Sequence, residues 1–574
     1  MQHFRLSPPS HAALLLLLAA PSPIPAQTAP AAPTSAPVTS TTIAQTPVIP
    51  VLRAQARLVV VDVVVLNKTG AAVHGLKQSD FVLSENNAPQ AIKSFQEHAD
   101  TAGDSAFIPP PHFPPGVFSN FAPTPVNDSV NVLLLDALNT PVTDQPYLRA
   151  QLLDYIKHER PGTTVAVFAL ASRLSMLQGF TSAPEILKTA AERPFGQASP
   201  LLRDNVAEGG NSTTAQEAFP RVGAPLPAEV LAGLQMFDEQ QKAARTRDRV
   251  TLTLQAMDQL ARYLANIPGR KNLIWFSGSF PLDFNPASTG TSTTSADPFV
   301  SVNSFEKEYR ETTNLLARGQ VAVYPIDARG IRVSPVFEVA NSHPKFVEDD
   351  HQFYIENAQE HFTMERLAQD TGGQAFINTN GLSAAIAKAI TLGSNYYSLS
   401  YSPSDTRWKG DLRNIHVKLK GKGYQLSYRR GYFADDPNSS TSAVLYASSP
   451  NGEPGPDPMR AAMQRGAPTP TQILFKVRVL PVSTISEEKI ADRNKANIIK
   501  MKGPYRRFII DFGALPSGFL YPESEGGVRQ LAAEVVTLLY TPDGALVNSV
   551  VDSYHARLTP ADYAGLQRTS ISSH

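Results

Sequence analysis

The chain has 574 residues, which is enough for three or four domains at about 150 residues each. It carries 51 Lys and Arg against 51 Asp and Glu, so its formal net charge is zero and gives no reason to expect nucleic acid or an anionic membrane as partner. It has no cysteine, which excludes disulfides, zinc–thiolate sites, a thiol nucleophile and a lipid-modified cysteine.

Residues 1–26 have the pattern of an export signal. Arg5 supplies positive charge, residues 12–20 (AALLLLLAA) form a short apolar core, and Ala26 offers a small residue for cleavage. This core is shorter than the ~20 residues that span a bilayer, although an uncleaved short anchor is the alternative, and no other segment approaches a membrane span. We therefore predict an exported protein of the periplasm, the cell envelope or the extracellular space.

Two linkers flank a first β-rich region. Residues 27–56 are rich in Pro, Ala and Thr and are expected to be an extended linker. Residues 57–99 contain the strand-like segments LVVVDVVVL, FVLSE and AIKSF, which predict a small all-β module. Residues 100–128 are loaded with Pro and Phe, and we interpret them as a second linker.

Between residues 129 and 394, short apolar runs alternate with helical patterns. This alternation predicts a wound α/β domain with a mostly parallel sheet. The predicted strands begin at Val130, Thr164, Leu174, Asn272, Val321 and Gln374, and the predicted helices are Gln145–Glu159, Pro184–Glu192, Arg245–Asn266, Phe305–Arg318, Phe362–Gln369 and Ser383–Leu392.

Three polar insertions interrupt this domain, at Arg193–Ala244, Pro281–Val302 and Arg329–Asn357. The last two each follow a predicted strand, so they leave the carboxyl edge of the sheet, and the first is expected near the same edge. Long loops in a compact domain are usually either functional or disordered. The three insertions therefore either frame a binding surface or decorate the domain without function.

The carboxyl-terminal third is β-rich. Residues 395–434 hold three segments of alternating apolar and polar residues, which predict an antiparallel β extension of the α/β domain. Residues 435–471 form a Pro/Ser/Gly linker. Residues 472–574 predict a β-sandwich-like module that shows no clear closing strand, so this module is either short or incomplete.

The first strand of the α/β domain ends in a carboxylate. The run Val130–Leu135 is almost wholly apolar, which is typical of a strand buried on both faces, and Asp136, Asn139 and Thr140 follow it. Ligands of wound sheets bind beyond the carboxyl ends of the strands. Asp136 is thus placed to meet a cation or polar ligand, or else it caps the following turn.

Several segments together resemble the VWFA-related Acidobacterial domain family, a divergent branch of the von Willebrand factor type A domains. They are VVVDVVVLNKTGAAVHGLKQSDFVLSENNAPQAIKSF, VNVLLLDALNT, YLANIPGRKNLIWFSGSFP, VAVYPIDARG, ERLAQDTGGQAF, NYYSLSYSPSD and YRRGYFA, spread from about Leu58 to Ala434. The resemblance implies a Rossmann-like sheet with helices on both faces, flanked here by small all-β modules. It also implies a role in binding and a metal site at the top of the sheet.

In the wider fold, the metal site uses an Asp-x-Ser-x-Ser loop, a Thr from a second loop and an Asp from a third. Asp136 and Thr140 match the first loop, but Leu138 replaces its first Ser and Ser277 stands where the third-loop Asp is expected. Thr246 or Thr251 could supply the second loop. The resemblance thus implies a degenerate site for Mg²⁺ or another divalent cation, weak or lost, whose remaining ligands are Asp136, Asn139, Thr140, Ser277 and Asp327.

The sequence predicts a binding protein and no enzyme, since it lacks a nucleophile elbow, a His-Glu-x-x-His helix and a Walker loop. The leading hypothesis is an exported adhesion-type protein whose α/β domain engages a protein or cell-surface ligand through loops at the carboxyl edge. The alternative is a structural or assembly factor of the cell envelope with a metal-independent docking domain. An unrecognised hydrolase is the third hypothesis.

Overall fold

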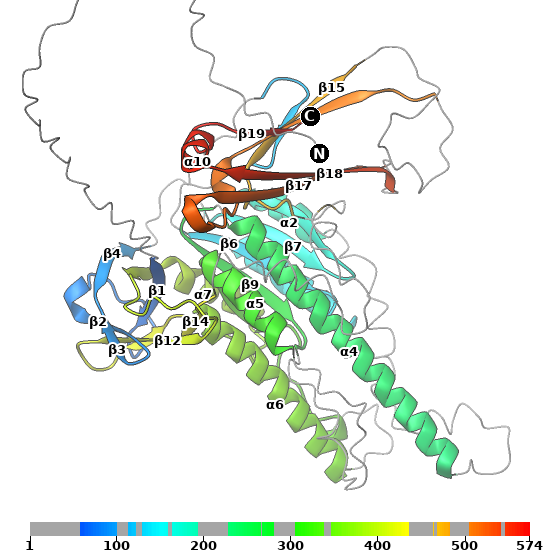
Figure 1. Ribbon diagram of the computed structural model, residues 1–574. Coiled ribbons are helices and arrows are strands. Elements are labelled where there is room, and N and C mark those ends of the chain that lie inside the picture. The colour runs from blue at the N-terminus through cyan, green and yellow to red at the C-terminus, as the bar shows by residue number, and fades with distance from the viewer. Residues whose placement is uncertain are drawn as a thin grey trace, which may run out of the picture.

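A five-stranded sheet forms the centre of the α/β domain (Figure 1). The computed structural model describes residues 58–99, 113–121, 129–158, 163–192, 228–265, 267–280, 305–337, 346–435, 463, 468–482, 504–540 and 546–573. The strand order is β10 (Val321–Asp327), β9 (Arg270–Ser277), β6 (Ser129–Asp136), β7 (Val165–Leu170) and β8 (Leu174–Thr181). The first four are parallel, and β8 is an antiparallel strand at the edge of the sheet.

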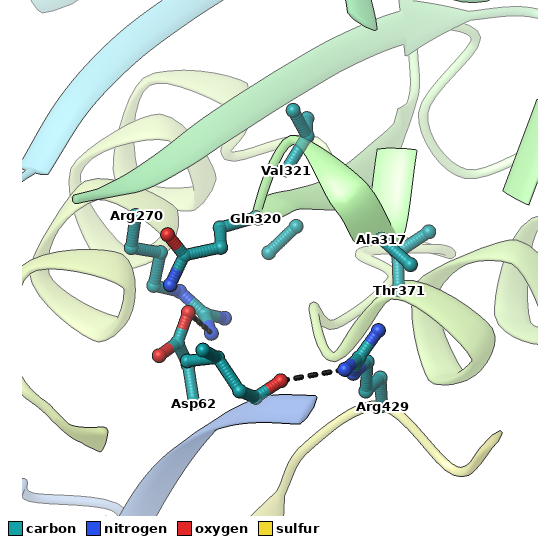
Figure 2. A pocket seen from close by; sticks show the side chains of 9 residues that line it. Asp62, Arg270, Ala317, Gln320, Val321, Thr371 and Arg429 are labelled. Carbon is teal, nitrogen blue, oxygen red and sulfur yellow. Dashed lines mark hydrogen bonds and ion pairs between the residues drawn. The ribbon is translucent and has the colours of Figure 1, made fainter. Parts of the chain in front are cut away.

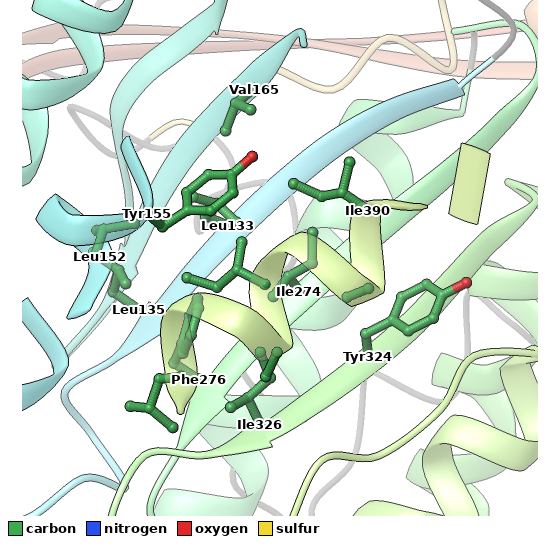
Figure 3. Packing of buried hydrophobic residues seen from close by; sticks show 14 of the residues in the cluster. Leu133, Leu135, Leu152, Tyr155, Val165, Ile274, Phe276, Tyr324, Ile326 and Ile390 are labelled. Atoms are coloured by element: carbon green, nitrogen blue, oxygen red, sulfur yellow. The ribbon is translucent and has the colours of Figure 1, made fainter. Parts of the chain in front are cut away.

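Helices cover both faces of this sheet, as expected for strands that are apolar on both sides. One face packs against α1 (Gln145–His158), α2 (Pro184–Glu192) and α7 (Leu382–Ser394), in the core that Figure 3 shows around Leu133, Ile274 and Tyr324. The other face packs against α4 (Ala228–Leu264), α5 (Glu306–Arg318) and α6 (Phe346–Thr371). The α/β part of the predicted fold class is therefore present.

The strand order reverses between β6 and β9. The chain passes from β6 through α1 to its neighbour β7 on one side, whereas β9 lies on the other side of β6 and leads through α5 to β10. Such a reversal is the usual ligand position in wound sheets, because the loops on its two sides diverge above the carboxyl ends of the strands. Asp136 ends one of these two strands and Ser277 ends the other.

The β segments before and after the α/β domain pair with each other and form one unit. Strand β11 (Tyr396–Tyr401) lies between β1 (Val59–Leu66) and β4 (Ile92–His98), and β12 (Leu412–Leu419) pairs with β2 (Phe81–Glu85). Three short strands complete the two sheets: β3 (Ala88–Gln90), β13 (Gln425–Ser427) and β14 (Gly431–Phe433).

This pairing corrects the prediction of a separate module at 57–99 and a separate extension at 395–434. Each of the two sheets takes strands from both segments, and the sheets share a core that includes Val61, Val63, Leu399 and Val417. The α/β domain is thus inserted into a two-sheet sandwich built from both flanking segments.

The predicted linker 100–128 and the carboxyl-terminal region share a sheet. Strand β5 (Val117–Ser119) pairs with β15 (Phe475–Pro481), which pairs with β16 (Phe508–Ala514), and β16 pairs with β19 (Ile571–Ser573). Part of the predicted linker is therefore a strand, and the last described residues add an edge to this sheet. Strands β17 (Arg529–Tyr540) and β18 (Leu546–Leu558) form a long hairpin, followed by α10 (Pro560–Leu566).

Two helices are much longer than the sequence predicts. Helix α4 begins at Ala228, inside the predicted insertion 193–244, and α6 begins at Phe346, inside the predicted insertion 329–357. Short 3-10 turns at Gln78–Asp80, Pro335–Phe337 (η4), Pro516–Gly518 and Glu525–Gly527 complete the described elements. The added turns of α4 are rich in Ala and Gln and those of α6 in Glu, which favour helix without producing a clear apolar stripe.

Some predictions fall outside the described residues. The export signal and the first linker lie wholly there, as do most of the linker at 435–471 and the insertion 281–302. Among the helices that the structure does describe, none is both long and apolar enough to span a membrane.

Candidate functional site

The strand register places three predicted site residues along one edge of the sheet. Asp136, Ser277 and Asp327 are the last residues of β6, β9 and β10, and Ser277 lies opposite Asp327 in the β9–β10 pairing. Residues 139 and 140 follow β6 in the adjoining loop, where both side chains are buried. The sheet therefore gathers all five predicted residues at its carboxyl edge.

Asp136 is fully buried and accepts hydrogen bonds from five donors. Its Oδ1 accepts from the backbone N–H groups of Leu138 at 3.1 Å and Asn139 at 3.0 Å. Its Oδ2 accepts from Asn139 Nδ2 at 2.7 Å, Trp275 Nε1 at 3.0 Å and Ser277 Oγ at 2.9 Å. Burial raises the pKa of the Asp136 carboxyl above its ordinary value, while the bonds from Asn139, Ser277 and Trp275 act to lower it.

This donor set does not fit the divalent cation that the resemblance implies. An ionised carboxylate has about four lone-pair positions, and five N–H and O–H donors surround this one. The indole N–H of Trp275 can only donate, so it cannot turn an acceptor toward a cation. Leu138 is buried and brings no ligand atom. The carboxylate orders its own loop and joins it to β9.

The second-loop position is also altered. Thr246 and Thr251 both lie within helix α4, and the Thr251 hydroxyl donates to the Arg247 carbonyl one turn earlier. The threonine that reaches the site is Thr253, whose Oγ1 accepts from Asn139 Nδ2 at 2.8 Å. Asn139 thus links Asp136 to α4 and uses its amide N–H groups, not its carbonyl oxygen, toward both partners.

Asp327 belongs to a second, ionic cluster on the same edge. Its Oδ1 accepts from Arg329 Nε at 2.9 Å, and its Oδ2 contacts Arg329 Nη2 and His361 Nε2, each at 2.9 Å. Arg329 Nη1 also donates to Glu360 Oε2 at 2.6 Å. Burial opposes ionisation, but the hydrogen bonds from His361 and Arg329 hold the pKa of Asp327 below its ordinary value. A fixed guanidinium thus neutralises this carboxylate and ties the loop after β10 to α6.

Helices α4 and α6 extend beyond this edge of the sheet (Figure 1). Thr253 of α4 and His361 of α6 contact residues at the ends of β6 and β10, and both helices run opposite to the strands. At 1.5 Å per residue, the preceding helical residues project by about 37 Å in α4 and about 22 Å in α6.

Helices α4 and α6 and the loop after β10 carry exposed apolar side chains. Phe337 is 70% exposed and Phe362 is 60% exposed, although aromatic side chains are normally buried in a domain core. The full set, here called the apolar rim, is Val230, Met236, Phe237, Ile331, Val333, Phe337, Tyr354, Ile355 and Phe362.

Sequence reasoning missed the partners that decide the chemistry of this edge. The contact between Trp275 and Asp136 could have been predicted from the sequence. A tryptophan in a buried parallel strand needs an acceptor for its N–H, and Asp136 is the acidic residue that ends the neighbouring strand. His361, Glu360 and Thr253 lie on helices far from the strands in sequence. Nothing in their spacing shows which helical turn faces the sheet edge.

No family model and no curated protein matches the chain. An aerotolerance-related membrane protein from Bacteroides fragilis aligns at 12% identity with a TM-score of 0.21, covering 46% of this chain and 98% of that one. The protein BatB from Bacteroides thetaiotaomicron gives 13% identity and a TM-score of 0.20, covering 46% and 97%.

The VWA domain of SpRpn10 gives 10% identity and a TM-score of 0.15, covering 39% of this chain and 94% of that domain. These likenesses are too slight to carry an argument. The functional proposal therefore stands on the strand order and on the geometry of the carboxyl edge.

Proposed function

We propose that the chain is an exported binding protein whose α/β domain is of the von Willebrand type A kind and engages a protein partner without a metal ion. The carrying observation is the set of five donors that surrounds the Asp136 carboxylate, where the wider fold would hold a cation. Because hydrogen bonds from within the protein compensate the charge of Asp136, its role is structural: it holds its own loop against β9 at the carboxyl edge of the sheet.

The apolar rim supports partner binding at this edge. Contiguous exposed apolar side chains mark interaction sites more often than scattered single residues do, and η4, which carries Phe337, contacts α6, which carries Tyr354, Ile355 and Phe362. Aromatic residues also supply most hot spots of protein interfaces. The ionic cluster of Asp327, Arg329, Glu360 and His361 holds the loop after β10 against α6, so this part of the surface is ordered before binding.

The proposal is tested by capture from the secreted and envelope fractions of the source cells, with the purified protein immobilised. Phe337→Ala and Phe362→Ala are expected to lose the captured partner, since both remove exposed aromatic side chains of the rim. Phe118→Ala is the matched control, because Phe118 is 61% exposed on β5, outside the rim.

Capture that survives a chelator and Asp136→Asn, but not the rim substitutions, is the expected result. Capture that requires a divalent ion would instead support a metal-dependent adhesion site. If the Phe118 variant loses the partner as completely as the rim variants do, the rim is not the binding surface.

The second candidate is an assembly factor of the cell envelope that docks permanently. The exposed apolar side chains of the rim favour it, since obligate interfaces are more apolar than transient ones. A permanent partner would co-purify through washing and gel filtration at nanomolar concentration, whereas a reversible ligand would dissociate. That the chain is no enzyme stays a prediction, checked by the absence of turnover on esters, peptides and glycosides.

A further inference from the structure

A small pocket lies at the opposite end of the sheet, where the β-sandwich meets the starts of β9 and β10 (Figure 2). Asp62 of β1, Arg270 of β9, Arg429 between β13 and β14, and Gln320 before β10 contribute side chains to its wall. The free space is about 20 Å³, which is room for one water molecule or one ion of similar size.

Arg270 is a buried cation with incomplete pairing. Its side chain is only 2% exposed, and its Nη2 donates to the hydroxyl of Tyr324 at 3.2 Å and the carbonyl of Gly372 at 2.7 Å. The Asp62 carboxylate lies 3.9 Å from Nη1, beyond hydrogen-bonding distance. The buried Nε of Arg270 has no hydrogen-bond acceptor within the described ranges.

Arg429 is a second cation on the same wall. Its Nη2 donates to the Val60 carbonyl at 2.6 Å, a neutral acceptor, and its buried Nε also meets no acceptor in the part of the chain that is described. Burial lowers the pKa of Arg429 below its ordinary value. A guanidinium nevertheless stays protonated in proteins, so the charge remains, and the opposite charge that acts on it is the Asp62 carboxylate, which Arg429 shares with Arg270.

The charges on the pocket wall do not balance. Two guanidinium groups face one carboxylate, and that carboxylate also accepts from the Ser398 hydroxyl at 2.9 Å. Lys271, the next residue after Arg270, is buried with its Nζ donating to the Gly319 carbonyl, and burial lowers its pKa to about 8. Buried charges are costly unless they are paired, so the excess positive charge calls for an anion.

We propose that this pocket binds one small monovalent anion, with chloride as the simplest example. Arg270 and Arg429 would supply the positive charge and the free N–H donors, and the size of the pocket would exclude larger anions. Because the two arginines come from the α/β domain and the sandwich, the anion would fasten these two units together.

The test measures the melting temperature of the purified protein while sodium chloride replaces sodium gluconate at constant ionic strength, which separates binding from screening. Chloride is expected to raise the melting temperature in a saturable way. Asp62→Asn is expected to reach half of the rise at a several-fold lower chloride concentration, because it removes the competing carboxylate.

Arg429→Met is expected to lose the rise, whereas Arg407→Met, which removes an exposed arginine paired with Asp405, should keep it. Crystals soaked in bromide locate the ion directly, and an anomalous peak between Arg270 and Arg429 supports the site even if Arg429→Met fails to fold. Equal melting in chloride and gluconate for wild type and Asp62→Asn, or bromide peaks on the surface alone, would overturn the proposal.

Discussion

Replacing Asp136 with alanine tests whether this carboxylate is a structural acceptor or a metal ligand. Of its five donors, three have a second acceptor: Leu138 N can bond to Leu170 O, Asn139 Nδ2 to Thr253 Oγ1 and Ser277 Oγ to Ser279 O. The other two, Asn139 N and Trp275 Nε1, have no second acceptor in the described part of the chain. The substitution therefore strands two buried donors.

Each stranded donor costs about 1–3 kcal/mol, so the two together cost about 2–6 kcal/mol. Part of this is recovered, because the raised pKa of Asp136 shows that burying its charge is itself unfavourable. We expect a net loss of about 3 kcal/mol, near the lower end of that range. For a domain of 150–250 residues this corresponds to a fall of about 6–12 °C in melting temperature.

The assay is thermal unfolding of wild type, Asp136→Ala, Trp275→Phe and the double variant, each with chelator and with Mg²⁺, Mn²⁺ or Ca²⁺. The double variant is expected to be more stable than the sum of the single losses predicts, because Trp275→Phe removes one of the stranded donors. Wild type is expected to melt at the same temperature under all four conditions. A divalent ion that stabilises wild type but not Asp136→Ala would refute the structural interpretation.

Three further predictions follow from other contacts. Gly278→Ala should cost about 1–3 kcal/mol in urea unfolding, since its Cβ would lie 2.7 Å from the Asn139 carbonyl; an unchanged midpoint contradicts this. The pKa of Asp327 is lowered in the folded protein, so the stability that its ionised carboxylate contributes is present above pH 3.8 and is lost as the pH falls through the folded-state pKa. Asp327→Asn should therefore cost about 2 kcal/mol of folding stability at pH 7, and the variant should lose less stability than wild type when the pH is lowered. A fragment of residues 129–435 should aggregate in gel filtration where 58–435 stays monomeric, because β11 loses both neighbours; a soluble monomeric short fragment would contradict the shared sandwich.

The buried strands were predictable because their physics is local. In β6, β7, β9 and β10 the apolar run is short, is flanked by polar residues and needs no knowledge of its partners. The sandwich was not predictable in the same way. Its strands β1 and β11 are more than 300 residues apart in sequence, and the apolar pattern of neither strand specifies which strand it pairs with.

The candidate site was likewise predictable only in part. That Asp136, Ser277 and Asp327 gather at one edge follows from parallel strands of similar length, so their placement could be inferred from the sequence. The groups that contact the site could not be inferred, because the contacts of Trp275, Thr253 and His361 depend on the direction of each side chain and on the rotation of each helix about its axis. Those two variables decide whether a carboxylate faces a cation or a ring of N–H donors.

The insertion of the α/β domain into the sandwich gives its two ends different roles. The Ser129 hydroxyl donates to the Ser394 hydroxyl at 3.1 Å, so the chain enters and leaves the domain side by side, and Asp62 and Arg270 join the sandwich to the amino-terminal end of the sheet. That end is thereby fixed to the remainder of the chain. The carboxyl edge lies at the other end of the strands, where α4 and α6 project. A partner bound there would meet the apolar rim without displacing the sandwich, and it would leave the anion pocket, at the other end of the strands, uncovered.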